Sequence, residues 1–372
     1  MKFIGESLPV RADHNERITR IGPQTPCGRL MRKYWQPIAL LDEFDPRLDP
    51  RMATRPLKAV RVLGQDFVLF RDEKGQYGLV DRDCPHRGAD LAFARHEGDG
   101  IRCPFHGWKF DTAGRCLETP AEPAGSKLCE RVRQRSYPLH IRSGLIFAWL
   151  GPEDETPPAF PALDCFLAPD SHTFAFKGMW ACNWLQAFEV GIDPSHTSFL
   201  HRFFQDESLE GTYGRQFRGA SAGDVSGERW PMTRIMREFV QPDIQPEATP
   251  YGMRLTTLRK MSQELTHVRI THALFPHINV HDQWACESMG PVADRTRENL
   301  GLSDKAIMLN RRILMKAIDD VEAGLEPVGF AKSEVAQTRI GPDTVDGIAP
   351  AEDWENWWKQ AVQSKRQSAP WS

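Results

Sequence analysis

The sequence has neither an excess of one charge sign nor a long hydrophobic run. Its 47 lysines and arginines nearly balance 50 aspartates and glutamates, and a net charge of −3 creates no overall field that would attract nucleic acid or a membrane surface. The longest apolar runs, such as residues 145–150, are far shorter than the roughly 18 residues that a membrane-spanning helix needs. The first residues include charged side chains and no extended apolar stretch, so we expect no secretory signal and a cytoplasmic protein.

The sequence also lacks internal repeats, low-complexity tracts and a Gly-x-Gly-x-x-Gly motif placed after a strand. Without a nucleotide-binding loop, this chain is not expected to oxidise NADH itself. Hydrophobic residues make up 40% and charged residues 26%, which is ordinary for a globular protein and far from the composition of a disordered chain. The length of 372 residues favours two domains.

The first half of the chain has the pattern of a small antiparallel β domain. An amphipathic helix is predicted from residue 27 to about Pro37. Strand-like segments follow, with turn residues between them, at 59–63, 67–70, 77–80, 114–117 and 140–150. Five prolines then crowd residues 151–170, which we interpret as a connection between domains.

The second half mixes helical and strand-like patterns. Helices are predicted over 183–192 and 303–321, and Asp193 and Pro194 have the types of an N-cap and a first helical residue, starting a helix to about residue 203. Strand-like runs occur at 234–240, 253–260 and 267–275. The fold class predicted from both halves is α+β. We expect domains at 1–165 and 166–345 and a C-terminal tail at 346–372.

Two short pairs of cysteine and histidine carry the strongest chemical signal. Cys84 and His86 form a Cys-x-His pair, and Cys103 and His106 form a Cys-x2-His pair, separated by residues 87–102. Two thiolates and two imidazoles could hold zinc in a tetrahedral S2N2 site. They could equally hold a two-iron, two-sulfur cluster in which one iron binds both cysteines and the other both histidines.

Three observations favour the cluster. A zinc knuckle usually pairs Cys with Cys and His with His along the chain, whereas each pair here has one of each. Both pairs include proline, and Trp108 and Phe110 supply apolar bulk that could shield a redox centre from water. Replacing two thiolates by imidazoles also raises the potential of a cluster. The other six cysteines lack such spacing and are expected to be ordinary thiols: Cys27, Cys116, Cys129, Cys165, Cys182 and Cys286.

The motifs CPHRGADL (84–91) and CPFHGWKF (103–110) resemble the cluster motif of the Rieske-type non-haem iron oxygenases. The resemblance extends over nearly the whole chain, from MRKYW (31–35) to DRTRENLG (294–301). It implies a Rieske 2Fe-2S cluster held by Cys84, His86, Cys103 and His106. It also implies a catalytic domain of the helix-grip, START-like kind, with a mononuclear Fe(II).

A second candidate metal site lies in the segment NWLQAFEVGIDPSHTSFLH (183–201). Two histidines five residues apart follow an acidic residue, and two histidines with one carboxylate form the ligand set of non-haem iron oxygenases. The segment resembles the catalytic motif of the phthalate dioxygenase-like branch of this family. On that resemblance His196 and His201 bind iron, and Asp193 links the iron of one subunit to a cluster histidine of its neighbour, with His106 favoured.

The third iron ligand is expected from the segment HDQWACESMGP (281–291). Asp282 stands at the place of the acid in the family, and Glu287 is the rival. His277 and His281 lie nearby, but an ordinary structural role is favoured for both.

The chain departs from the family at one place. Relatives have a long stretch of sheet and loop between the strand ending near Pro276 and the acid-bearing segment, and only a few residues separate them here. Either the chain has lost those strands or the sequence is closed up over missing residues. We favour the second, because a half-open sheet would expose backbone edges.

The resemblance implies the terminal oxygenase component of a multicomponent system acting on an aromatic compound that bears a carboxylate. A reductase or ferredoxin would supply electrons, and a homotrimer is the family expectation. Arg229, Arg234 and Arg254 could pair with a carboxylate, although solvated arginine is commoner. An O-demethylase on the same scaffold and a stand-alone Rieske electron-transfer protein remain as alternatives, as does a zinc-stabilised binding module.

Overall fold

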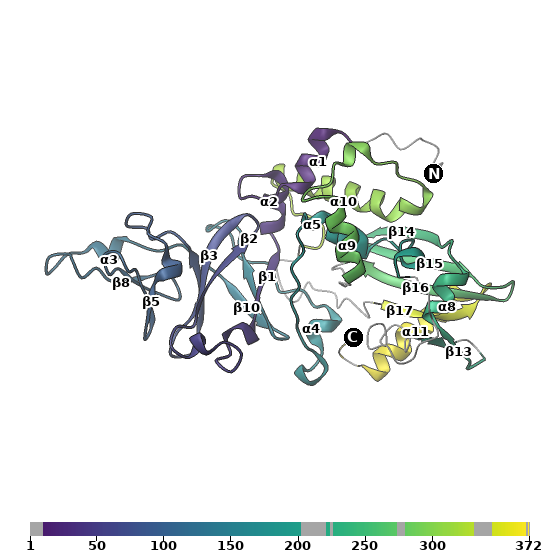
Figure 1. Cartoon of the computed structure of the whole chain (residues 1–372), viewed down its shortest axis with the longest axis horizontal. Helices are drawn as coiled ribbons and strands as arrows, with labels where there is room; N and C mark the ends of the chain where they lie inside the picture. Colours follow the sequence, from purple (N-terminus) through teal and green to yellow (C-terminus); the bar gives the residue numbers. More distant parts are fainter. Residues whose placement is uncertain are drawn as a thin grey trace.

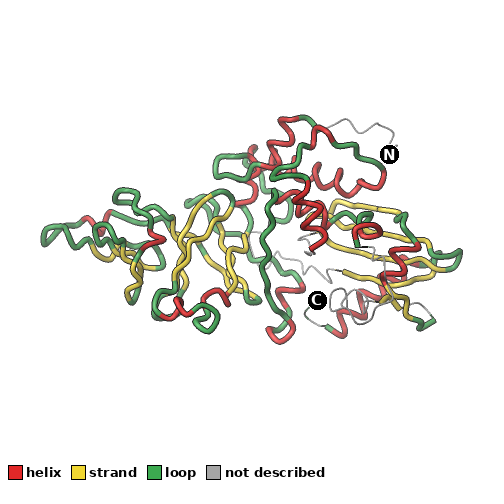
Figure 2. The backbone as a smooth tube through the Cα atoms, viewed as in Figure 1, coloured by secondary structure: helices red, strands yellow, loops and turns green. Residues whose placement is uncertain are grey.

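The computed structural model describes residues 10–201, 221–223, 226–273, 280–330, 344–369 and 371. Within these residues the chain forms two units at opposite ends of an elongated molecule (Figure 1). Strands dominate the N-terminal unit (35–150), whereas the C-terminal unit (184–369) combines a sheet with helices (Figure 2). The architecture is therefore α+β, as the sequence predicts.

Three antiparallel sheets build the N-terminal unit, in the orders β1-β11-β10, β2-β3-β4-β9 and β5-β6-β7-β8. Their strands are β1 (Trp35–Leu40), β2 (Leu57–Val62), β3 (Gln65–Arg71), β4 (Tyr77–Asp81), β5 (Arg95–Glu97), β6 (Gly100–Arg102), β7 (Lys109–Asp111), β8 (Cys116–Glu118), β9 (Ser136–Tyr137), β10 (Leu139–Arg142) and β11 (Leu145–Trp149). The short helix α3 (Leu128–Arg131) belongs to this unit, and α4 (Asp164–Leu167) follows it in the segment between the two units. The sheet of β5 and β8 forms the end of the molecule far from the C-terminal unit (Figure 1). The predicted antiparallel β region is confirmed.

The helix predicted from residue 27 to Pro37 is too long. α2 (Pro26–Arg32) begins after Thr25, whose hydroxyl oxygen accepts a hydrogen bond from the Gly28 N–H, and it ends before β1. Pro37 has no N–H to donate to a helical hydrogen bond. The segment pairs with β11 instead. Together with α1 (Ala12–Thr19), α2 packs on the helices of the C-terminal unit.

The C-terminal unit contains a four-stranded antiparallel sheet in the order β14-β15-β16-β17 and a smaller pair, β12-β13. The strands are β12 (Ser221–Gly223), β13 (Arg229–Pro231), β14 (Asp243–Thr249), β15 (Gly252–Lys260), β16 (Leu265–Ala273) and β17 (Thr344–Pro350). The helices are α5 (Trp184–Gly191), α6 (Thr197–Leu200), α8 (Met232–Glu238), α9 (Val280–Ser288), α10 (Lys305–Glu322) and α11 (Trp354–Ser368). The predictions of α5, α10, β15 and β16 are confirmed.

Two other predictions in this unit need correction. Residues 234–240 are not a strand, because they lie mostly in α8, where Met232, Ile235 and Phe239 recur at helical spacing and join one apolar cluster. The helix after Asp193 begins later than expected, at Thr197. Its predicted end near residue 203 lies outside the described residues.

The two faces of the four-stranded sheet pack on different partners. On one face, Val268 and Ile270 pack against the tryptophans of α11. On the other, Met253 and Leu255 pack with α10. Side chains alternate along a strand, so Arg259 lies on the same α10 face as Met253 and Leu255. The register of β15 with β16 places His267 opposite Arg259 and Arg269 opposite Thr257, and both lie on that face too.

The C-terminal segment belongs to the structural core of its unit. β17 pairs along β16, and α11 covers the adjoining face. The junction at which the sequence predicts missing strands includes residues 274–279, which lie outside the described part of the chain. Among the described helices, none combines the length and the apolar composition required to traverse a bilayer.

Candidate metal centres

The two Cys/His motifs of the N-terminal unit form loops of the same backbone pattern. In each, the cysteine N–H donates to the carbonyl five residues later, at 2.8 Å in both loops. In each, a glycine four residues after the cysteine donates its N–H back to the cysteine carbonyl, Gly88 to Cys84 and Gly107 to Cys103. Both glycines have positive φ, +70° and +75°. The spacing of each motif therefore encodes a tight turn that presents its side chains toward the other loop.

Gly107→Ala is expected to destabilise the N-terminal unit more than Gly88→Ala. Both substitutions place a Cβ at positive φ, which costs about 1–2 kcal/mol. A Cβ at 107 would also lie 2.8 Å from Cγ of Pro120, whereas a Cβ at 88 meets no atom within 4 Å. We expect losses in unfolding free energy of about 1 kcal/mol for Gly88→Ala and about 3 kcal/mol for Gly107→Ala. Denaturant unfolding followed by circular dichroism measures both, and equal losses would contradict this account.

The four side chains separate into two pairs. Cys84 and Cys103 are buried, and burial with the neighbouring Cys103 thiol raises the pKa of Cys84 to about 11. The imidazoles of His86 and His106 are half-buried, with ring centroids 4.5 Å apart. Trp108 stacks on His86 at 4.4 Å and shields the pair from one side.

This arrangement fits a two-iron, two-sulfur cluster. Two neighbouring thiols suit one iron, and two neighbouring imidazoles suit the other. Nδ1 of His106 is buried and has no hydrogen-bond partner among the described residues, as expected of an atom reserved for a metal. The partition of sulfur and nitrogen to two sides fits two metal ions better than the single zinc ion of the alternative.

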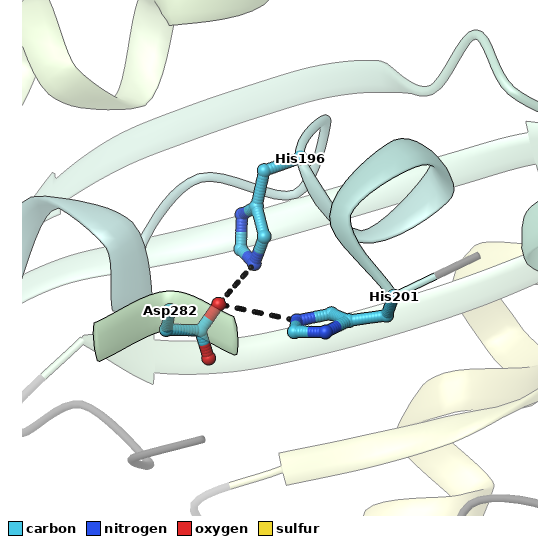
Figure 3. A group of neighbouring side chains, drawn as sticks. All are labelled: His196, His201 and Asp282. Atoms are coloured by element: carbon cyan, nitrogen blue, oxygen red, sulfur yellow. Dashed lines mark ion pairs between the residues drawn. The ribbon is translucent and has the colours of Figure 1, made fainter. Parts of the chain in front are cut away.

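A second centre lies in the C-terminal unit, where His196, His201 and Asp282 converge (Figure 3). Oδ1 of Asp282 lies 3.3 Å from Nε2 of His196 and 3.2 Å from Nε2 of His201. One potential ligand atom from each of the three residues lies within 4.8 Å of the other two. Asp282 is 5% exposed, and its Oδ1 makes no hydrogen bond within the described residues. The sequence prediction thus names three residues that the fold brings together.

Regular helix geometry does not by itself produce this convergence. Residues five apart are separated by about 140° around an α-helix, so His196 and His201 would point to different sides of one. α6 is only a single turn, and His201 already has non-helical dihedral angles at its end. Asp282 comes from the first turn of α9, which adjoins α5. Tertiary packing therefore completes the site.

The electrostatics of the second centre suit a divalent cation. Burial lowers the pKa of His196, but the carboxylates of Asp193 and Asp282 outweigh burial and raise it to about 9. Burial raises the pKa of Asp282, and the two imidazoles in turn lower it to about 2. A cation that binds here would displace the imidazole proton into the solvent and would take its place beside the carboxylate. Two histidines and one carboxylate on one side of the site match the donor set of ferrous oxygenases.

Of the remaining predicted residues, Asp193 lies beside this centre. Oδ1 of Asp193 accepts a hydrogen bond from the Ser195 N–H at 2.8 Å, and its Oδ2 lies 3.6 Å from Nδ1 of His196. Glu287, the rival of Asp282, accepts instead from the Ala181 N–H and the Gln283 amide. His281 belongs to α9, and His277 lies outside the described residues.

The sequence analysis suggested three arginines as partners for a substrate carboxylate, and none of them lies on the face of the sheet beneath the second centre. Arg234 forms an ion pair with Glu238 within α8, and Arg229 is exposed on β13. Arg254 pairs with Glu247 and lies over Trp358 of α11, on the other face of the sheet. The arginines on the α10 face are Arg259 and Arg269, which the sequence analysis missed. Strand alternation relative to Met253 and Leu255 was the signal that could have found them.

Comparisons with known proteins support the same division of the chain. A model described as "Rieske [2Fe-2S] domain" matches residues 36–138, and one described as "LigXa C-terminal domain like" matches residues 273–369. The 5,5'-dehydrodivanillate O-demethylase oxygenase subunit of Sphingobium sp. (strain NBRC 103272 / SYK-6) is 31% identical, with 90% of this chain and 86% of the relative covered. The phthalate 4,5-dioxygenase oxygenase subunit of Pseudomonas putida is 34% identical, with 87% and 89% covered.

Both alignments, of 385 and 416 positions, are longer than this chain of 372 residues, so each relative has residues opposite gaps in it. The fold is also that of a solved structure, dicamba monooxygenase bound to dicamba, with a TM-score of 0.52 at 17% identity over 79% of this chain and 98% of that one. This chain belongs to the Rieske-type non-haem iron oxygenases, as the oxygenase component of a multicomponent system.

Proposed function

We propose that Cys84, His86, Cys103 and His106 hold the Rieske cluster and that His196, His201 and Asp282 hold the mononuclear iron. The observation that carries this proposal is the convergence of three ligand atoms within 4.8 Å from two segments that are far apart in the sequence. When bound, the cluster supplies single electrons, and the ferrous ion supplies the place where dioxygen is activated beside the substrate. A stand-alone electron carrier would not need the second constellation.

The two centres of one chain lie in different units, and the sheet of β5 and β8 is remote from α9 (Figure 1). We therefore place the working pair of centres across a subunit boundary, in a closed head-to-tail ring, with three subunits as the expected number. Asp193 then accepts a hydrogen bond from a cluster histidine of the neighbouring subunit, with His106 favoured. In the same chain its other oxygen faces His196, so that one carboxylate contacts both ligand sets.

The proposed substrate is an aromatic compound bearing a carboxylate. Arg269 supports this, because it lies on the α10 face of the sheet opposite Thr257 and two residues from His267. Its side chain is 38% exposed, and its Nη1 lies 3.9 Å from Oδ2 of Asp346, at the long limit of an ion pair. A guanidinium exposed to this extent can also bind a carboxylate through two hydrogen bonds. Phthalate 4,5-dioxygenase, a relative, is named for such an acid.

Ring dihydroxylation is the reaction that we propose, and O-demethylation is the second candidate because a relative of equal coverage is an O-demethylase subunit. Both reactions need electrons from outside this chain. We propose a flavin and iron-sulfur reductase dependent on NAD(P)H, or a ferredoxin, as the donor. Since NAD(P)H is a cytoplasmic reductant, we place the enzyme in the cytoplasm. We also propose residues 1–165 as the first domain and 166–369, in place of 166–345, as the second, because β17 and α11 pack on the sheet of the C-terminal unit.

Incubation of the holoenzyme with a surrogate reductase, isotopically labelled O2 and a panel of aromatic acids tests this function. Dihydroxylation places both labelled atoms in the ring product, whereas O-demethylation of a methoxy acid releases formaldehyde and a phenol. An iron content of two per chain, with no oxygenated product, would identify a simple electron carrier instead.

A variant of Arg269 tests the proposed substrate class in the same assay. Arg269→Met is expected to raise KM for the preferred acid about tenfold or more, because a charge-assisted pair is lost. The KM for the neutral methyl ester of the same acid should stay unchanged. Arg254→Met, on the opposite face of the sheet, is the matched control. Equal effects on acid and ester would contradict carboxylate recognition by Arg269.

A further inference from the structure

One buried arginine lies directly beneath the turn that carries His196. Arg259, on β15, is 1% exposed. Its Nη2 donates to the Pro194 carbonyl at 2.8 Å and to Oγ1 of Thr197 at 3.2 Å. The Thr197 hydroxyl itself donates to the same Pro194 carbonyl at 2.8 Å. A single guanidinium thus joins the residues on either side of the Ser195 and His196 pair.

The turn needs such an anchor. α6 is a single turn, and helices of this length are not stable by themselves. Regular helix geometry also would not orient His196 correctly, because its ring must approach both a histidine five residues away and an acid on another helix. The hydrogen bond from the Ser195 N–H to Asp193 fixes only the start of the turn. Arg259 fixes its middle from below.

Arg259 itself is held on a rigid support. Its strand pairs on both sides, and its carbonyl accepts a hydrogen bond from the Thr266 hydroxyl at 3.1 Å. His267, directly opposite it on β16, lies 2.6 Å from Asp346 of β17 through Nε2. A side chain on a central strand is placed more accurately than one on a loop.

The charge of this arginine is unusual for its place. No carboxylate of the described residues lies within ion-pair distance of it, and its Nε makes no hydrogen bond there. Burial and the nearby Arg269 lower the pKa of Arg259 to about 10, while Asp346 opposes them, so the side chain stays charged at neutral pH. Burying a cation is costly. A protein is expected to keep a buried arginine, despite this cost in free energy, where the fixed planar donors of its guanidinium define a geometry that lysine cannot.

We propose that Arg259 is a positioning residue for the mononuclear metal site: by clamping Pro194 and Thr197 it sets the direction of the His196 ring toward His201 and Asp282. This inference rests on the proposed assignment of those three residues as metal ligands. The role is exerted through the backbone turn, and Arg259 touches neither the metal nor the substrate.

The test uses the full-length holoenzyme and two readouts other than turnover. The first is the rate at which Fe(II) passes to a chromophoric chelator, and the second is the EPR spectrum of the ferrous site after addition of nitric oxide. In Arg259→Met, iron release should be about 10-fold faster or more, in the range found when groups that orient metal ligands are removed. The EPR spectrum with nitric oxide should be broader and should show more than one ferrous species, because the His196 ring is no longer held in one orientation. Visible absorption of the Rieske cluster should be unchanged.

Three further variants make the outcome decisive. Arg259→Lys keeps the charge but not the fork of donors, so it should restore the wild-type release rate only in part. Thr197→Val removes one arm of the clamp with little change of volume, and it should accelerate release less than Arg259→Met does. Arg254→Met, from the opposite face of the same strand, should match the wild type. Should Arg259→Met not fold, Thr197→Val and Arg259→Lys decide the question.

Wild-type release rates and spectra in Arg259→Met, or in both milder variants when that protein does not fold, would overturn the positioning role. Failure of the underlying assignment gives a different result. In that case the wild-type protein itself would hold no ferrous ion beyond the two irons of the cluster, and nitric oxide would produce no ferrous signal at all.

Discussion

The His196→Ala protein is expected to keep its red-brown Rieske chromophore and to lose one of about three irons per chain, with turnover falling to the limit of detection. His196 supplies one of three ligand atoms, and its loss leaves Oδ1 of Asp282 with a single imidazole at 3.2 Å. Two protein ligands hold Fe(II) far more weakly than three. Iron and sulfide analysis beside a visible spectrum measures the outcome.

The complementary variant is Cys103→Ser, which should abolish the cluster absorption, because a thiolate ligand is replaced by a hydroxyl. The mononuclear iron should remain, since the two centres belong to different units and the sheet of β5 and β8 is remote from α9 (Figure 1). Cys165→Ser is the matched control, because that cysteine is exposed and outside both centres. A His196→Ala protein with unchanged iron content would refute the ligand assignment.

Asp193→Asn should leave both metals bound and slow turnover by about 100-fold. The asparagine side chain can still accept the Ser195 N–H as a cap, so the turn survives. The negative charge beside Nδ1 of His196, 3.6 Å away, is lost. In the proposed ring, the hydrogen-bonded contact with a cluster histidine of the neighbouring subunit is weakened as well. An effect of this size is typical when a group that orients a metal ligand is replaced.

Rapid mixing of the reduced enzyme with substrate and O2 separates this role from a structural one. The rate at which the reduced cluster is re-oxidised should fall in Asp193→Asn, while iron content, cluster absorption and melting temperature match the wild type. Asp294→Asn is a suitable control, because Asp294 likewise accepts from a backbone N–H two residues on, that of Thr296, and belongs to neither set of ligands. Full activity in Asp193→Asn would exclude the bridging role.

The local parts of both centres could be read from the sequence. The two Cys/His motifs encode turns within a few residues, and the backbone of each turn depends on its own proline, glycine and cysteine. The alternating strands around these loops are likewise local patterns. The segments 183–192 and 303–321 have enough apolar residues at helical spacing to be predicted as helices.

Segments whose conformation depends on a distant partner were predicted less well. Residues 35–40 have an apolar pattern that fits a helix, and they form β1 because β11 pairs with them. Residues 234–240 are predicted as a strand, but most of them lie in α8, whose Ile235 packs with Ile348 of β17. Short apolar runs are ambiguous in this way until their neighbours are known.

The sequence by itself pointed to two candidate metal centres, because histidine, cysteine and carboxylate residues recur there at close spacing within motifs that resemble those of the family. The tertiary structure decided which distant residues join those segments. It brought Asp282 to the two histidines and placed Arg254 on one side of the sheet and Arg259 and Arg269 on the other. The physical reason is that strand register and helix docking follow from the summed packing of many weak contacts, which no single motif records.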